Sequence, residues 1–310
     1  MQEGSRRAIV AALLANIGIA LAKLLAFAVT GASSMLAEAI HSIADTGNQG
    51  LLMFGSHRSK KPADERHPFG HGTARYLWAF IVALVLFSVG GLFAVFEGIE
   101  KLLHPHTLDS PGWAIGVLLV AAVLEGLSLR TARREARPFL HGQSMLSFIR
   151  HTKNPELPVV LLEDSGALIG LFFALVGVVL AAVTGNGRYD AVGSLAIGVL
   201  LVVIASLLAT EMSSLIVGES ASPSEVAAIE DAIRRGPNVT RLIHMRTLHL
   251  GPEDVLVAAK VEFDAALTVP ALADAIDGTE VEIRRALPQA RLVFIEPDVF
   301  RDSTGSADGA

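Results

Sequence analysis

The chain has 310 residues, of which 52% are hydrophobic and only 18% are charged. Soluble domains carry about 25% charged residues, so this composition excludes an ordinary soluble protein and also a disordered one. The formal net charge of −6 disfavours nucleic acid as a partner. Because the chain has no cysteine, disulfides, thiolate metal sites and iron–sulfur clusters are excluded within it.

Six apolar stretches are long enough for a helix to cross the hydrocarbon core of a membrane, which takes about 20 residues. The loops at 56–75 and 131–156 contain five Lys or Arg residues each, whereas the alternate loops contain at most one. By the positive-inside rule, we expect a multi-pass protein of the cell (inner) membrane with both termini in the cytoplasm. The predicted spans are residues 8–30, 33–55, 76–99, 112–130, 157–184 and 189–210.

The chain changes character near residue 212. Residues 1–212 carry 16 basic and 15 acidic residues, whereas residues 213–310 carry 9 and 16. We therefore predict a six-helix transmembrane domain over 1–212, an α+β cytoplasmic domain over 213–302 and a disordered tail over 303–310. In the second domain, helical and strand-like patterns alternate as αββαβ, which suggests a small sheet with helices on one face. The predicted helices are 222–236, with Ser222 or Ser224 as N-cap, and 269–287; the predicted strands are 239–250, 254–263 and 290–299.

The second span carries a row of polar residues. Glu38, His41 and Asp45 are spaced i, i+3 and i+7, and Asn48 continues the row. This spacing places them on one helix face. Ionisable groups inside a membrane are costly and typical of functional sites. The alternative is a stripe of polar contacts that holds helices together.

The fifth span carries an adjacent pair of carboxylates, Glu163 and Asp164. Neither polar span has a basic side chain in its core, and Lys23 on the first span is the nearest candidate countercharge. Carboxylates and a histidine without such a countercharge predict a cation between the second and fifth spans. Imidazole together with carboxylate suits Zn²⁺ and related divalent ions.

A second group of metal-ligating residues lies in the first basic loop. The stretch ADERHPFGHG places Asp64, His67 and His71 at i, i+3 and i+7. The residue types indicate a metal site. The alternative is a polar loop whose histidines are incidental.

These motifs resemble those of the cation diffusion facilitator family, the divalent-metal/proton antiporters. The resemblance rests on TGASSMLAEAIHSIADTGNQ and KPADERHPFGHG, and it covers nearly the whole chain. VVLLEDSGALIG on the fifth span resembles the subgroup that includes the mitochondrial zinc exporter of animals.

The resemblance implies a transport site with two ligands from the second span and two, four residues apart, from the fifth. These positions are His41, Asp45, Asp164 and Val160, and valine cannot bind a metal. Glu163, Asn48 or water could supply the missing ligand. A regular helix aims only one of Glu163 and Asp164 at the second span, and the motif match picks Asp164.

The resemblance also implies sites outside the membrane. The family's loop site maps onto Asp64, His67 and His71. The tail is then a ferredoxin-like domain, which in the family often holds a zinc pair at a homodimer interface.

In this chain His244, Glu296 and Asp298 fall on or near the positions of that zinc pair. Lys260 stands where a metal-binding histidine would be expected. His244 and His249 can equally be ordinary strand residues.

The sequence thus predicts a homodimeric exporter of divalent cations, with Zn²⁺ as substrate, protons as counter-ion and no prosthetic group. Mn²⁺, Fe²⁺, Co²⁺ and Ni²⁺ are alternative substrates. A passive cation channel is the alternative of another class. No HExxH or GxSxG motif occurs, so the sequence does not favour an intramembrane enzyme.

Overall fold

The computed structural model describes residues 3–105, 108, 110–140 and 144–301, and the side chains among them apart from those of residues 3–15, 139, 146 and 150–151. The chain forms two compact units. The membrane unit comprises Met1–Arg58 and Ala74–Ser213, and the C-terminal unit comprises Ser59–Thr73 and Ser214–Ala310. The loop of residues 59–73 is therefore grouped with the C-terminal unit. The predicted domain limits stay a prediction, and residues 303–310 lie outside the described residues.

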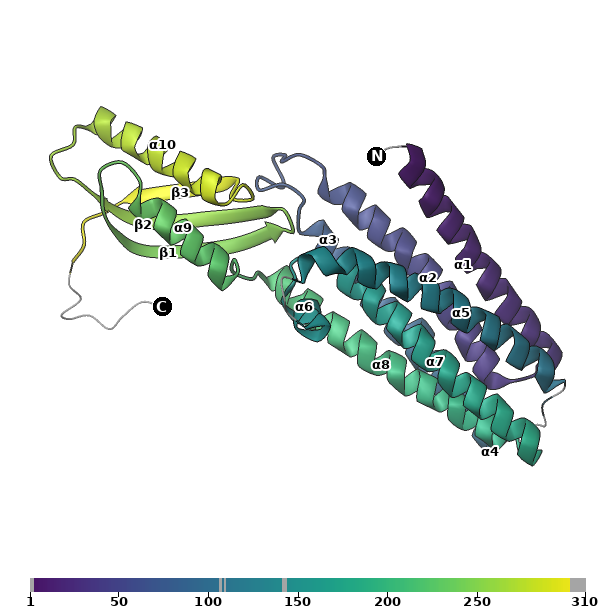
Figure 1. Cartoon of the computed structure of the whole chain (residues 1–310). Coiled ribbons are helices and arrows are strands. Elements are labelled where there is room, and N and C mark those ends of the chain that lie inside the picture. Colours follow the sequence, from purple (N-terminus) through teal and green to yellow (C-terminus); the bar gives the residue numbers. More distant parts are fainter. Residues whose placement is uncertain (1–2, 106–107, 109, 141–143, 302–310) are drawn as a thin grey trace. The chain divides into compact units, whose positions relative to one another are not determined.

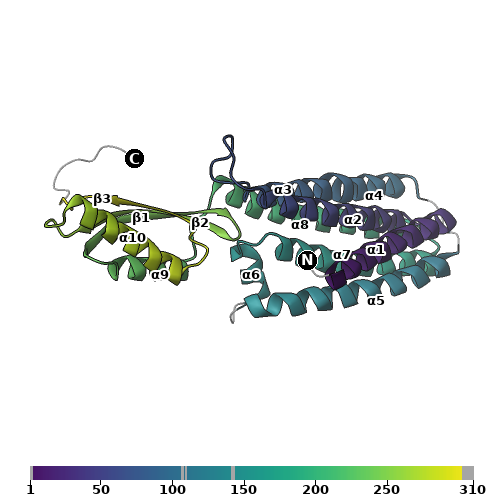
Figure 2. The ribbon, with the colours of Figure 1, turned by 90° about the horizontal axis from the view of Figure 1, so that it is seen from above.

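Long helices lie side by side in the membrane unit, with their axes roughly aligned (Figures 1 and 2). Each predicted span corresponds to one of these long helical segments. The third is continuous from Ala74 to Leu103 but passes through a π-helical stretch at its centre. The elements are α1 (Glu3–Thr30), α2 (Ser33–Ser59), α3 (Ala74–Val85), η1 (Leu86–Leu92), α4 (Phe93–Leu103), α5 (Pro111–Ala136), η2 (Arg137–Phe139), α6 (Met145–His151), α7 (Glu156–Thr184) and α8 (Arg188–Val217).

Four of these segments are long and apolar enough to cross a membrane: α3–η1–α4, α5, α7 and α8. The described part of α1, Asn16–Thr30, is a shorter apolar helix. The polar row on α2 makes this helix less apolar than the four. Three residues of the row, Glu38, His41 and Asn48, are buried. The chain therefore has the helices of a multi-pass membrane protein.

Glycines allow α4 and α8 to approach closely. A Cβ at Gly98 would lie 2.9 Å from the backbone nitrogen of Leu195, and one at Gly198 would lie 2.6 Å from that of Val95. Because real Cβ atoms are essentially never this close to backbone, a larger residue at either position would push the two helices apart. Close backbone approach at small residues is how helices pack in membranes.

A buried carboxylate fixes the start of α2. Asp190, in the first turn of α8, accepts hydrogen bonds from the backbone N–H groups of Ser33 and Ser34 at 2.6 and 3.3 Å. It also accepts from both serine hydroxyls. These bonds satisfy N–H groups that a helix start leaves without partners, and the negative charge suits that end of the helix dipole. Asp190 therefore anchors α2, which carries the polar row, to α8.

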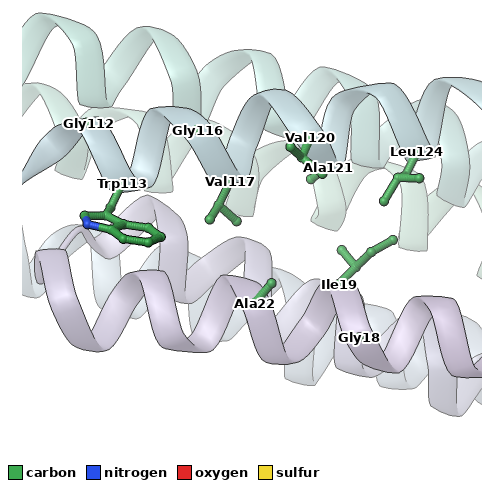
Figure 3. A pocket seen from close by; sticks show the side chains of 10 residues that line it. All are labelled: Gly18, Ile19, Ala22, Gly112, Trp113, Gly116, Val117, Val120, Ala121 and Leu124. Atoms are coloured by element: carbon green, nitrogen blue, oxygen red, sulfur yellow. The ribbon is translucent and has the colours of Figure 1, made fainter.

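A large apolar cavity lies between α1 and α5 (Figure 3). It has a volume of about 760 Å³ and is lined by residues such as Ala22 of α1 and Trp113 and Val117 of α5. No carboxylate or imidazole among the described residues lines it. It therefore offers no ligand to a metal cation.

The C-terminal unit has the predicted element order αββαβ. Strands β1 and β2 are antiparallel, β2 and β3 are parallel, and the sheet order is β1-β2-β3. Ser222 is the N-cap of the first helix and forms a capping box with Glu225, which decides between the two predicted caps. The elements are α9 (Pro223–Arg234), β1 (Val239–Gly251), β2 (Asp254–Phe263), α10 (Val269–Ala286) and β3 (Leu292–Pro297).

One face of this sheet is buried by both helices (Figure 2). Every second residue of β2 is buried, which follows from the two-residue period of a strand. Ile229 and Ile233 of α9 and Ile283 of α10 pack against these residues. The opposite face of the sheet carries His244, Lys260 and Glu296, which pair across the strands.

Candidate metal-binding site

A small polar cavity lies among α1, α2, α5 and α7. Its volume of about 20 Å³ is enough for one water molecule, which needs roughly 10–15 Å³, or for one ion of similar size. Three of the predicted transport-site residues line it: Asp45, Glu163 and Asp164. The complete lining is Asn16, Ile19, Ser42, Asp45, Gln49, Glu125, Ser128, Val160, Glu163 and Asp164.

His41 lies one turn before Asp45 on α2. Its ring is 1% exposed, and its Nδ1 lies 3.4 Å from Asp45 Oδ1. Among the described residues, neither ring nitrogen has a hydrogen-bond partner. A buried polar group without a partner is costly, so the imidazole is poised to bind something besides the neighbouring side chains.

Glu163 and Asn48 contact each other. Asn48 Nδ2 donates a hydrogen bond of 2.7 Å to Glu163 Oε1, and both side chains are buried. The two residues that the sequence offered as replacements for Val160 are therefore linked. Asn48 Oδ1 has no hydrogen-bond partner in the part of the chain that the structure describes.

Asp164 faces α5. Ser128 Oγ donates a hydrogen bond of 2.8 Å to Asp164 Oδ2. The carboxylate that accepts a hydrogen bond from α2 is therefore Glu163, whereas the motif match had aimed Asp164 at this helix. Adjacent residues on a helix point about 100° apart, and the cavity lies between the two directions, so both carboxylates reach it.

The sequence reasoning missed Glu125, the carboxylate that α5 contributes to this cavity. The signal was present, since Glu125 is the one ionisable residue between residues 110 and 129 of an apolar span. Such a residue is a functional candidate by default. Glu125 lies on the fourth predicted span, whereas the recognised motifs lie on the second and fifth spans.

Lys23 forms its ion pair with Glu38. Lys23 Nζ lies 3.0 Å from Glu38 Oε2 and donates a 2.7 Å hydrogen bond to Ser42 Oγ. Both ionic side chains are completely buried. A side chain at Gly170 of α7 would collide with Glu38 Oε1, so the glycine leaves room for this pair.

The cavity carboxylates have no such partner. In the part of the chain that the structure describes, no lysine or arginine forms an ion pair with Asp45, Glu125, Glu163 or Asp164. Burying four carboxylates around a space the size of one water molecule is costly unless their charge is compensated. A cation bound in this space would compensate it.

The loop residues form a more compact group. His67 Nδ1 lies 3.1 Å and His71 Nε2 lies 3.7 Å from the Asp64 carboxylate. Among the described residues, no other set of three metal-ligating side chains has its ligand atoms all within 4.8 Å of one another. The backbone N–H of His67 and further hydrogen bonds lower the pKa of Asp64 below its usual range, so it remains a carboxylate. Three such ligands leave a fourth position open for water around Zn²⁺.

His244, Glu296 and Asp298, the candidate ligands of the C-terminal unit, are each contacted by a basic side chain. Lys260 Nζ is 3.1 Å from Glu296 Oε1 and 3.3 Å from Asp298 Oδ2. Arg246 Nε donates to His244 Nε2 at 3.2 Å. The two carboxylates raise the pKa of Lys260, and the N–H of Val299 together with Lys260 lowers that of Asp298.

Truncation of this lysine tests whether it occupies the place of a metal. Lys260→Ala leaves Glu296 and Asp298 without their cation, so the zinc affinity of the full chain at this site is expected to rise roughly tenfold. Equilibrium dialysis with Zn²⁺ measures the change. Arg234→Ala, which removes a cation from an exposed pair with Glu230, is the matched control. Equal zinc binding by Lys260→Ala and the wild type would contradict the interpretation.

The fold and the cavity define a multi-pass membrane protein with a small α+β unit and a buried, acidic, cation-sized site. Residues 9–217 match the model of the cation efflux transmembrane domain. The chain therefore belongs to the cation diffusion facilitator family, and within the family it resembles the mitochondrial zinc exporter.

Three relatives show the range of the similarity. The human "Proton-coupled zinc antiporter SLC30A9, mitochondrial" is 35% identical over 78% of this chain and 43% of the relative. "Metal tolerance protein C4" of Arabidopsis thaliana is 26% identical over 86% of this chain and 58% of the relative. "Cation-efflux pump FieF" of Pectobacterium atrosepticum is 26% identical over 87% and 85%. The chain thus spans less than half the length of the mitochondrial relatives that it matches.

Proposed function

We propose that this chain exports divalent metal cations, with Zn²⁺ as the substrate, in exchange for protons. The observation that carries the proposal is the cavity among α1, α2, α5 and α7, where four carboxylates without a basic partner surround a space of about 20 Å³. The printed names of the relatives, a proton-coupled zinc antiporter and a cation-efflux pump, support the same activity. The chain is then a secondary transporter and not an enzyme.

Exchange of metal for protons follows because both bind to the same ligand atoms. Asp45, Glu163 and Asp164 must be deprotonated to bind a metal, and His41 must be neutral, so metal binding releases protons. If the cavity opens in turn to the two sides of the membrane, metal loads from the cytoplasm and protons replace it from outside. The proton gradient then drives export.

The remaining architecture of the proposal follows the family. Six spans with both termini in the cytoplasm would place the basic loops on the inner side of the membrane. The αββαβ unit would be a ferredoxin-like domain at a homodimer interface. Asp64, His67 and His71 would bind a metal on the cytoplasmic side.

Reconstituted liposomes test the proposal. The purified full chain is incorporated with a zinc indicator inside, and a pH gradient with an acidic interior is imposed. Zinc uptake is expected to rise with the gradient and to fall when an ionophore dissipates it. Uptake that follows the zinc gradient alone and ignores the pH gradient would favour the passive channel. A panel of Mn²⁺, Fe²⁺, Co²⁺ and Ni²⁺ ranks the alternative substrates.

His41 is expected to set the choice of metal. Imidazole favours Zn²⁺, Co²⁺ and Ni²⁺ over Mn²⁺, relative to a site made of carboxylates alone. In His41→Asp, transport of Mn²⁺ relative to Zn²⁺ is expected to rise by roughly tenfold. His57→Asp, at the far end of the same helix, serves as the matched control. An unchanged ratio of the two metals would show that His41 does not determine selectivity.

A further inference from the structure

The predicted ligand pattern leaves a gap at one point of the cavity wall. Val160 occupies the position four residues before Asp164 and lines the cavity. Its side chain is a hydrocarbon and cannot bind a cation. One part of the wall, where the family resemblance implies a ligand, is therefore apolar.

Glu125 of α5 lines this same cavity. Helix α5 packs along α7. Ser128, one turn after Glu125 and on the same face, holds Asp164 by a 2.8 Å hydrogen bond. This face of α5 is thereby fixed against the α7 carboxylates. Glu125, Asp45 and Asp164 therefore contribute to the wall of one cavity.

A separate observation concerns buried polar atoms next to the cavity. His41 is 1% exposed, its ring nitrogens have no hydrogen-bond partner among the described residues, and its Nδ1 lies 3.4 Å from the Asp45 carboxylate that lines the cavity. Asn48, completely buried, donates to Glu163, another lining residue, while its Oδ1 has no partner in the described part of the chain. One nitrogen of the neutral imidazole and the amide oxygen thus each keep an unused lone pair beside a cavity carboxylate.

We propose that Glu125 is a cation-binding residue of the transport site and supplies the ligand that Val160 cannot. The site then takes its ligands from three helices, α2, α5 and α7, and its cargo is a divalent cation of the Zn²⁺ class. The inference rests on the proposed function, because it assigns a further ligand to the same site.

Zinc binding to Glu125→Gln tests the assignment. The measurement is equilibrium dialysis of the purified full chain with Zn²⁺, in a His67→Ala/His71→Ala background that removes the loop site. Glutamine keeps the size of the side chain and removes its charge. The loss of even an outer-shell partner weakens metal binding about 10–100-fold, so loss of a ligand is expected to raise the Kd by about 100-fold. Glu135→Gln, exposed on the same helix, should bind like the background protein.

A second variant separates a ligand from a structural residue. Glu125→Gln/Val160→Asp places a carboxylate four residues before Asp164, and it should recover most of the lost affinity. A double variant as weak as Glu125→Gln would overturn the ligand role.

Two further outcomes are distinguishable. Unchanged affinity in Glu125→Gln, together with lost affinity in Asp164→Asn, would overturn the inference and leave the proposed function standing. A background protein that binds no zinc and a wild type that transports none would instead overturn the proposed function.

Discussion

Replacement of either Asp45 or Asp164 by asparagine is expected to abolish zinc-driven proton exchange. Both carboxylates line the cation-sized cavity, one from α2 and one from α7. Asparagine keeps the shape, and at position 164 it can still accept the hydrogen bond from Ser128. It removes the charge that would hold a divalent ion and the site that a proton would occupy in exchange. We expect the flux to fall by more than about 100-fold, beyond the effect of losing an outer-shell group.

Flux in proteoliposomes, with matched amounts of inserted protein, measures this loss. Asp274→Asn, exposed on α10, is the control for the same chemical change elsewhere. Wild-type flux in either cavity variant would remove that residue from the transport site.

The second large effect is expected at the buried pair of Lys23 and Glu38. In Lys23→Met, Glu38 loses the ammonium 3.0 Å away and remains completely buried. Breaking a buried ion pair from one side costs about 3–5 kcal/mol, whereas replacing both partners is often close to neutral. We therefore expect a marked fall in the unfolding midpoint of Lys23→Met.

Thermal unfolding of the full chain in detergent measures this effect. Lys23→Met/Glu38→Gln is expected to recover most of the lost stability, because no uncompensated charge remains. Lys60→Met, at an exposed position, should unfold like the wild type. A double variant as unstable as the single variant would show that Lys23 does not act by neutralising Glu38.

Hydrophobic length and periodicity were enough to find the long helices of the membrane unit and the αββαβ order, whereas the short helix α6 was not predicted. The reason is that these features depend on the chain's own pattern: an apolar stretch of about 20 residues or alternation along a strand. The row of His41 and Asp45 on one face of α2 follows from helix geometry in the same way.

Contacts between distant segments could not be predicted in this way. The hydrogen bonds from Ser33 and Ser34 to Asp190 join residues more than 150 positions apart, and nothing local marks Asp190 as the anchor of α2. Glu125 was visible as a charge in an apolar span, but its place beside Asp164 depends on how α5 packs on α7. The direction of Glu163 toward α2 likewise depends on the rotation of α7.

The central claim is that metal and protons exchange at one cavity, and coupled flux tests it most directly. Liposomes containing the purified chain, with a zinc indicator and a pH indicator inside, receive Zn²⁺ outside without an imposed pH gradient. As Zn²⁺ enters, the account predicts that protons leave and the interior becomes alkaline, and that neither signal appears with Asp45→Asn or Asp164→Asn. Zinc entry without alkalinisation, or equal coupled flux in those variants, would contradict it.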